Sequence, residues 1–166
     1  MKLLITLLLI TFSTSCGQKI DDKRGIVCID SEDQYLKNKI EKMVNLFNYK
    51  TGKRVLVIVE CSLMNSSSVD FQDLDKILGL GGYKMWQVDY GTYQTIEMTS
   101  HVTLDTDFFR NADDYRAWLL FCHEFGHVFA IDHVEDMSSV MYPYIDKRPR
   151  DFYNFFQQVN RNSIAI

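Results

Sequence analysis

The sequence has few glycines and prolines, the residues that interrupt helices and strands, and neither positive nor negative charge is in large excess. Its 166 residues include 8 glycines and 2 prolines and show neither a low-complexity tract nor a repeat period, which excludes a disordered linker and a solenoid. Basic residues cluster only at 147–150, and the formal net charge is −4, so we do not expect binding to nucleic acid. With 46% hydrophobic residues, the chain is long enough for one core and too short for two.

An apolar run near the N-terminus, residues 3–12, is too short to span a bilayer as a helix. It follows Lys2 and precedes the small residues Ser13-Thr14-Ser15, which is the order of a secretory signal peptide. Cys16 directly after these residues resembles the lipobox of bacterial lipoproteins, with Ser13 in the place where that family usually has Leu. We therefore expect residues 1–15 to be a signal peptide.

Lipidation of Cys16 would make residues 16–24 a tether that holds a single domain, residues 25–166, at a membrane. Gly17 stands where an Asp can retain lipoproteins on an inner membrane, so we expect an outer-membrane or cell-surface location. A secreted protein with an unmodified Cys16 is the alternative.

The first half of the domain shows a β-α-β pattern. Residues 25–30 and 55–59 are expected as strands, and the helix between them is expected to begin after Ser31 and to end at Gly52. A loop over 65–68 and a short helix over 71–78 are expected next, and Gly79, Gly81 and Gly82 are expected to end that helix.

The second half is expected to hold two strands, over 92–99 and 101–104, and then a long helix. Asn111 and Asp114 form a candidate capping pair for that helix, which carries an apolar stripe through residues 115–129. A last helix is expected over 151–159.

The remaining cysteines are Cys28, Cys61 and Cys122. Cys28 and Cys61 lie in or beside two expected strands, so a disulfide between them is one interpretation and two buried thiols are the other.

Three of the four histidines lie in the segment His123-Glu124-Phe125-Gly126-His127 and at His133. Residues four apart lie on one face of a helix, so His123 and His127 can aim imidazole nitrogens at one ion. Catalytic zinc takes three protein ligands and keeps a fourth position for water, and His133 supplies the third ligand if the helix ends near Ala130. Glu124 then lies beside the metal, where its carboxylate can take a proton from the bound water.

Each part of this pattern has a purely structural alternative. Two histidines four apart arise by chance on amphipathic helices, and one further histidine is usually a surface residue. The combination favours a metal site. No Glu follows Glu135, which excludes the class of zinc peptidases that uses a downstream Glu as the third ligand.

Residues 123–133 resemble the metzincin signature HExxHxxGxxH, and residues 139–143 (SVMYP) resemble its Met-turn. The combined pattern is most similar to the matrixins, and residues 101–105 resemble the strand before their active-site helix. The resemblance implies an α+β, metzincin-like fold with a twisted mixed sheet of about four to five strands, an upper part over 25–130 and a small C-terminal subdomain over 131–166.

The resemblance also implies roles for individual residues. His123, His127 and His133 would bind one catalytic Zn²⁺, Glu124 would be the general base and acid, and Met141 would form a hydrophobic floor beneath the metal.

Three features depart from the family pattern. Ala130 stands where the family usually has Gly in a left-handed turn, so either the turn differs or it costs about 1 kcal/mol. Pro143 replaces the Tyr that some metzincins add as a ligand, which implies a four-coordinate site. Only His101 is left for an upstream structural zinc, so we expect none.

Calcium is a further candidate ion, because four acidic residues lie close together in the sequence. A loop and helix N-termini explain these residues as well, and we favour that interpretation. The residues are Asp105, Asp107, Asp113 and Asp114.

The sequence as a whole favours a monomeric, zinc-dependent endopeptidase that takes peptide or protein substrates and is membrane-tethered if Cys16 is lipidated. The resemblance implies that substrate lies extended along an edge strand, for which residues 92–99 are the candidate, and we expect an apolar side chain after the scissile bond. The expected pocket residues are Leu119, Val140, Tyr142, Pro143 and Tyr144. The alternatives are a non-catalytic zinc-binding surface lipoprotein that acts as a binding module, and a protease with one dedicated substrate.

Overall fold

The computed structural model describes residues 18–61, 67–89 and 94–163, so the expected signal peptide and Cys16 lie outside the described residues. Across these ranges, no helix has the length and apolar character that crossing a membrane requires. The elements in chain order are β1 (Gln18–Asp22), β2 (Ile26–Asp30), α1 (Gln34–Thr51), β3 (Val57–Ile58), β4 (Ser68–Gln72), β5 (Gly79–Asp89), β6 (Gln94–Asp105), α2 (Thr106–Asn111), α3 (Asp114–Val128) and α4 (Phe152–Asn162).

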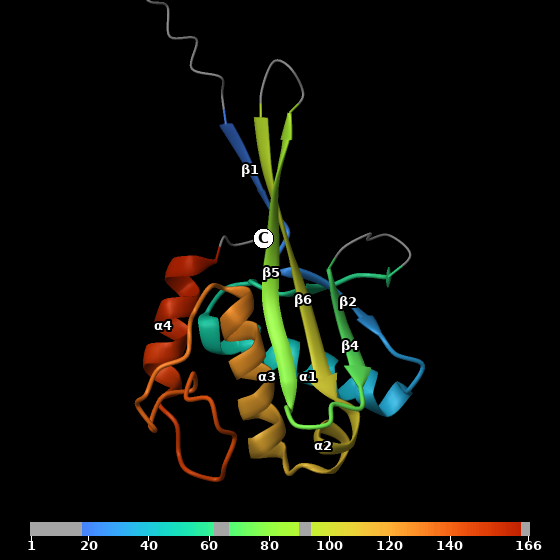
Figure 1. Ribbon diagram of the computed structural model, residues 1–166, viewed down its shortest axis with the longest axis vertical. Helices are drawn as coiled ribbons and strands as arrows, with labels where there is room; N and C mark the ends of the chain where they lie inside the picture. The colour runs from blue at the N-terminus through green and yellow to red at the C-terminus, as the bar shows by residue number, and fades with distance from the viewer. Residues whose placement is uncertain (1–17, 62–66, 90–93, 164–166) are drawn as a thin grey trace, which may run out of the picture.

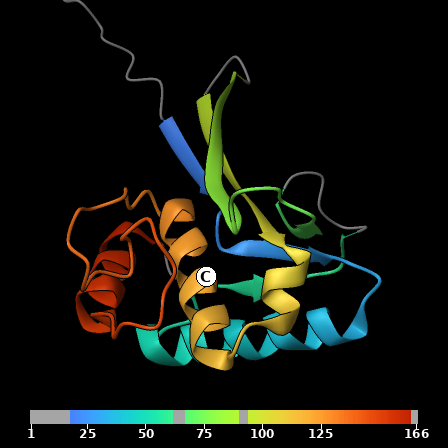
Figure 2. The ribbon, with the colours of Figure 1, turned by 60° about the horizontal axis from the view of Figure 1, so that its bottom comes forward.

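The described strands form one mixed sheet, as expected, with six strands instead of four or five. Their order is β1-β6-β4-β2-β3, all in parallel pairs, and β5 pairs with β6 in the antiparallel direction. Helices α1 and α3 lie on one side of this sheet, and α4 lies beside α3 (Figure 2). The ends of β5 and β6 project with β1 beyond the body of the molecule (Figure 1).

Strand β1 lies within the stretch that we expected to be a tether. Strand β6 is long enough to pair with β4 through residues 101–105 and with β1 through residues 94–98. Strand β4 does not reach residues 94–98 of β6, and Gln18–Asp22 pair with β6 in its place. This pairing satisfies backbone groups of β6 that would otherwise lack a partner in the sheet.

The β-α-β start is confirmed, with small shifts at the ends of its elements. Asp33, and not Ser31, caps α1, because its side chain accepts hydrogen bonds from the first amides of the helix. Gly52 ends α1 with a φ of 72°, as predicted. Strand β3 is shorter than expected because Asn48 Oδ1 accepts hydrogen bonds from the amides of Val55 and Leu56.

The interpretation of residues 65–82 is wrong in two places. Residues 68–72 form strand β4 rather than a loop and the start of a helix, and the three glycines lie inside strand β5 rather than ending an element. The two strands expected over 92–104 form one continuous strand, β6, which lies inside the sheet. The edge strand next to α3 is therefore β5.

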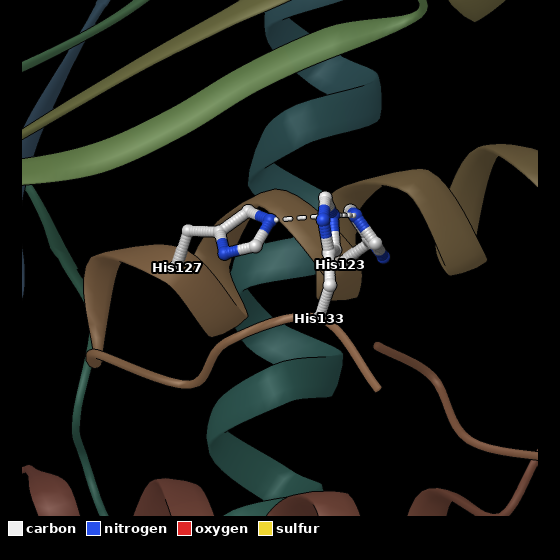
Figure 3. A group of neighbouring side chains, drawn as sticks. All are labelled: His123, His127 and His133. Atoms are coloured by element: carbon white, nitrogen blue, oxygen red, sulfur yellow. Dashed lines mark hydrogen bonds between the residues drawn. The ribbon is translucent and has the colours of Figure 1, made fainter. Parts of the chain in front are cut away.

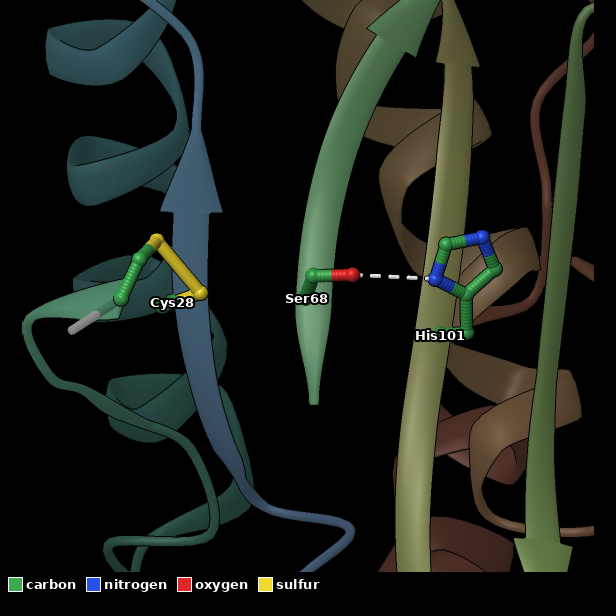
Figure 4. The surroundings of a disulfide bond; sticks show 4 residues. Cys28, Ser68 and His101 are labelled. Carbon is green, nitrogen blue, oxygen red and sulfur yellow. Dashed lines mark hydrogen bonds between the residues drawn. A yellow bond between two sulfur atoms is a disulfide. The ribbon is translucent and has the colours of Figure 1, made fainter. Parts of the chain in front are cut away.

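Cys28 and Cys61 form a disulfide that joins β2 to the segment after β3, with their Cα atoms 4.9 Å apart (Figure 4). The structure thus decides between the two interpretations of these cysteines. Cys122 is a buried free thiol in α3.

An aromatic cluster holds α1, α3 and α4 together. Phe47 of α1 lies at its centre, with ring centroids of both other helices about 5–6 Å away. Its neighbours are Phe121, Phe125, Phe155 and Phe156. Because Phe121 and Phe125 flank His123 along α3, this packing sets the rotation of the helix and directs His123, Glu124 and His127 away from the core.

The helix caps account for two of the acidic residues considered for calcium. Asp105 caps α2 and Asp113 caps α3, each by accepting a backbone amide with its side chain. The residue that caps α3 is therefore Asp113, and not the expected pair Asn111 and Asp114. Helix α4 begins after Asp151, close to the expected start.

Candidate metal centre

Three imidazole rings converge where α3 ends and the chain turns back (Figure 3). His123 and His127 come from α3, and His133 comes from the segment after it. The Nε2 atom of His133 lies 3.0 Å from Nε2 of His123 and 3.1 Å from Nε2 of His127. The predicted third histidine therefore faces the other two.

Backbone carbonyls determine which nitrogens of two of these rings face the centre. His123 Nδ1 donates a hydrogen bond to the Val140 carbonyl at 2.9 Å, and His127 Nδ1 donates to the Ile131 carbonyl at 3.0 Å. A carbonyl can only accept, so in the neutral rings the Nε2 atoms carry lone pairs. Such a hydrogen bond from the far nitrogen is the usual support of a metal-binding histidine.

The donor set fits a zinc ion. Nitrogens that coordinate Zn²⁺ tetrahedrally at about 2.0–2.1 Å are about 3.3 Å apart, close to the observed separations. Burial lowers the pKa of His123 to about 4, and the backbone hydrogen bond from its ring opposes this effect only in part. Burial, with the neighbouring His133, also lowers the pKa of His127. Both rings are therefore neutral at neutral pH, which is the form that binds a metal.

A left-handed turn brings His133 back to the site. Helix α3 ends at Val128, and Ala130 has a φ of 57°. The Ala130 amide donates to the His127 carbonyl at 3.0 Å, and the Ile131 amide donates to the Gly126 carbonyl at 2.9 Å. These are the two hydrogen bonds of a Schellman motif, so the turn is retained with Ala in place of Gly, at a cost of about 1–2 kcal/mol.

Glu124 lies between α3 and β5, with only 4% of its surface exposed. Burial raises its pKa to about 7, and a hydrogen bond from the Gly81 amide acts in the opposite direction. A Cβ atom at Gly79 would lie 2.6 Å from Glu124 Oε1, and one at Gly81 would overlap the Glu124 carbonyl oxygen. Glycines two apart share one face of a strand, and here they allow β5 to lie directly against α3.

The expected Met-turn packs against α3 from the other side. Met141 is 2% exposed, and its side chain occupies the space where Gly126 has no Cβ atom. The sequence patterns above assigned no role to Gly126, and they assigned Gly79 and Gly81 to the end of a helix rather than to a contact with α3. The spacing of the pair within an apolar, β-rich stretch is the signal that could have identified it.

A cleft of about 850 Å³ opens at the three histidines. Two expected pocket residues, Pro143 and Tyr144, line it, and three do not. Leu119 is wholly buried, whereas Leu120 lines the cleft. The side of α3 that faces the cleft passes through Leu120, His123 and His127. Val140 is buried as well and contributes its carbonyl to His123.

Tyr142, the third of these residues, does not line the cleft. The guanidinium groups of Arg148 and Arg150 lie over its ring, 5.7 and 5.2 Å from the ring centroid. The wall opposite Pro143 and Tyr144 is formed by β5 and the residues before it. That wall consists of Lys76, Ile77, Leu78, Gly79, Leu80, Gly81, Gly82 and Tyr83.

The fourth histidine lies on the sheet, apart from this site. His101 shares a hydrogen bond with Ser68 Oγ at 3.0 Å (Figure 4). It shares another with Thr103 Oγ1 at 3.1 Å. Within the described ranges, the three converging histidines form the one cluster of potential metal ligands.

Comparison with protein families gives a match to the matrixin model over residues 16–163. The matched range begins before β1 and extends through α4, so it includes the whole metal centre and the cleft. The comparison with curated proteins gives no match.

Proposed function

Because this chain belongs to the matrixin family of metallopeptidases, we propose that it is a zinc-dependent endopeptidase in which Glu124 is the general base. One observation carries the proposal: three imidazole Nε2 atoms converge, and they line the same open cleft as the buried residue Glu124. A purely structural cluster of histidines would need neither the cleft nor the buried acid.

The roles of the residues follow from their positions. His123, His127 and His133 would hold the metal. When bound, Zn²⁺ lowers the pKa of a coordinated water toward neutrality and polarises the carbonyl of the scissile bond. Glu124 takes a proton from the attacking water and passes it to the departing amine nitrogen. A carboxyl whose pKa is raised toward 7 binds and releases this proton readily near neutral pH.

Substrate binding is proposed along β5 instead of the expected strand at 92–99. In the described part of the sheet, β5 pairs only with β6, and its other edge borders the cleft, where the Gly81 amide is bonded to Glu124. An extended peptide can pair with such an edge, as in other peptide-binding proteins. Leu120, Pro143 and Ile145 line the cleft near the metal and favour an apolar side chain after the scissile bond.

A digest of a peptide library tests the proposal. The full chain loaded with zinc is expected to cleave, whereas Glu124→Gln is expected to bind zinc normally and to cleave at least about 10²-fold more slowly. His133→Ala is expected to lose zinc as well as cleavage. His101→Ala, which removes the histidine outside the site, is the matched control and should retain both.

Two outcomes would contradict the proposal in different ways. Cleavage by Glu124→Gln at the wild-type rate would remove Glu124 as the base. Wild-type protein that binds zinc and cleaves no peptide would favour the binding module instead. Attachment through Cys16 remains a separate proposal, which labelling of cells with a fatty-acid analogue, compared between wild type and Cys16→Ala, would test.

A further inference from the structure

The turn after α3 controls two of the three zinc ligands. It redirects the chain so that His133 faces the site, and its Ile131 carbonyl accepts the hydrogen bond from His127 Nδ1. A change in this turn would therefore rotate one ring and displace another.

The residue at the centre of the turn does not favour its conformation. Ala130 has a φ of 57°, where its Cβ atom crowds the backbone, whereas glycine adopts this φ freely. Strained conformations of this kind persist only where the surrounding structure holds them. The contacts around Phe129 and Ala130 should therefore include groups that hold the turn.

Asn162, the last residue of α4, makes such a contact. Its Nδ2 atom donates a hydrogen bond to the carbonyl oxygen of Phe129 at 2.8 Å. This carbonyl belongs to the peptide bond between Phe129 and Ala130, so the hydrogen bond restrains the rotation that sets the φ of Ala130.

Arg24 holds Asn162 in turn. One of its guanidinium nitrogens donates to the Asn162 carbonyl at 2.9 Å, and the group also binds both carboxylate oxygens of Asp22 at 2.9 and 2.8 Å. The same guanidinium lies over the Phe129 ring, 6.0 Å from its centroid. Arg24 is 8% exposed, so this arrangement is built into the body of the protein.

We infer that Asn162, supported by Arg24, is a positioning residue for the zinc site, because it holds the Phe129 carbonyl and so the left-handed turn that orients His127 and His133. The inference rests on the proposed metal site. It explains how this chain keeps the turn with Ala at position 130.

A matched pair of variants of the full chain tests the inference. Asn162→Ala removes the hydrogen bond to the Phe129 carbonyl. Asn160→Ala is the control, because Asn160 Nδ2 also donates to a carbonyl at a helix end, that of Thr51 in α1, at 2.9 Å. Zinc affinity is measured by competition with a chelator, and the stability of the metal-free protein is measured by urea denaturation.

We expect Asn162→Ala to weaken zinc binding about tenfold, the scale of a change behind a metal ligand, and Asn160→Ala to change it less than about twofold. Adding Ala130→Gly to Asn162→Ala should restore most of the affinity, because glycine needs no support at this φ. Adding Ala130→Gly to Asn160→Ala should bring no comparable gain. A residue that only stabilises the fold would show no such selective rescue.

Equal losses in the two Asn variants, or no rescue by Ala130→Gly, would overturn the inference while wild-type zinc binding and cleavage remained intact. Failure of the wild-type protein to bind zinc would overturn the proposed function and the positioning role together. In the metal-free protein, the shifts of the urea midpoint caused by Asn162→Ala and by Ala130→Gly should not add up to the shift of the double variant. Additive shifts would also count against the inference.

Discussion

His123 and Val140 are joined by a hydrogen bond of 2.9 Å between the imidazole Nδ1 and the backbone carbonyl. The segment that carries Met141 therefore determines which nitrogen of the first ligand faces the metal site. Met141 can lie so close to α3 only because Gly126 has no side chain. The Met-turn thus acts on the site through hydrogen bonding as well as through packing.

Gly126→Ala should disturb this arrangement. The added Cβ atom would overlap Met141 Sδ and lie 3.1 Å from Phe155 Cε2, so the buried Met141 side chain must move. We expect a loss of about 1–3 kcal/mol in the free energy of unfolding and about tenfold weaker zinc binding. Urea denaturation and chelator competition measure the two effects. Gly82→Ala, whose Cβ would meet no atom within 4 Å, is the stability control, and equal midpoints for both variants would contradict the expected clash.

Gly81→Ala should affect Glu124 more than the histidines. Its Cβ atom would overlap the Glu124 carbonyl, so β5 and α3 must separate at Glu124. We expect kcat to fall at least about tenfold, which is part of the roughly 10²–10⁴-fold contribution of a general base, while zinc affinity falls less. Steady-state kinetics and zinc titration of the same preparation measure the two effects. A variant whose zinc affinity falls as much as its kcat would contradict the prediction.

In the metal-free protein, His123 and Glu124 should make opposing contributions to the pH dependence of the free energy of unfolding. Burial lowers the pKa of His123 from 6.5 to about 4, so the unfolded chain binds more protons in this interval and stability rises with pH. Burial raises the pKa of Glu124 from 4.5 to about 7, so the folded chain keeps a proton that the unfolded chain loses, and stability falls with pH. The two contributions oppose each other between pH 4.5 and 6.5.

Glu124→Gln removes one of these opposing contributions. The free energy of unfolding should then rise with pH more steeply than in wild type, by up to about 1.4 kcal/mol per pH unit. Urea denaturation in the presence of a chelator measures the slope. Glu135→Gln, which removes an exposed carboxylate, is the control for net charge, and an unchanged slope in Glu124→Gln would show that Glu124 does not titrate in this way.

Asp105 should position one wall of the cleft. Its carboxylate accepts hydrogen bonds from the amides of Phe108 at 2.7 Å and Leu74 at 2.8 Å, and its own amide donates to the Leu78 carbonyl at 2.8 Å. The segment between Leu74 and Leu78, which carries Ile77 into the cleft, is thus tied to the start of α2 at both ends.

Asp105→Asn can cap α2 or bind Leu74, but its single carbonyl oxygen cannot do both as the carboxylate does. We expect KM to rise about fivefold, the equivalent of one lost hydrogen bond, with a smaller change in kcat. Asp113→Asn is the matched control, because Asp113 caps α3 through the Arg116 amide and makes no contact with the cleft wall. The same rise in KM for both variants would mean that capping alone matters.

The features of the site that depend on neighbouring residues could be predicted from the sequence. The spacing of His123 and His127 places both on one face of a helix whatever surrounds it, and Gly52 ends α1 for a local steric reason. The number of ligands that zinc requires added His133, which faces the other two histidines, and the family pattern added Met141, which lies against Gly126.

The long-range parts could not be read in this way. Strand partners depend on residues far apart in the chain, so the edge beside the cleft proved to be β5, and Gly79 and Gly81 proved to be contacts with α3 rather than breaks. For the same reason, pairing of the sheet decided that Cys28 meets Cys61. The order of residues determined which groups could bind a metal, because helical periodicity is local. Tertiary packing decided what holds them, because the hydrogen bond from Asn162 to the Phe129 carbonyl spans 33 residues and exists only once α3 and α4 have packed together.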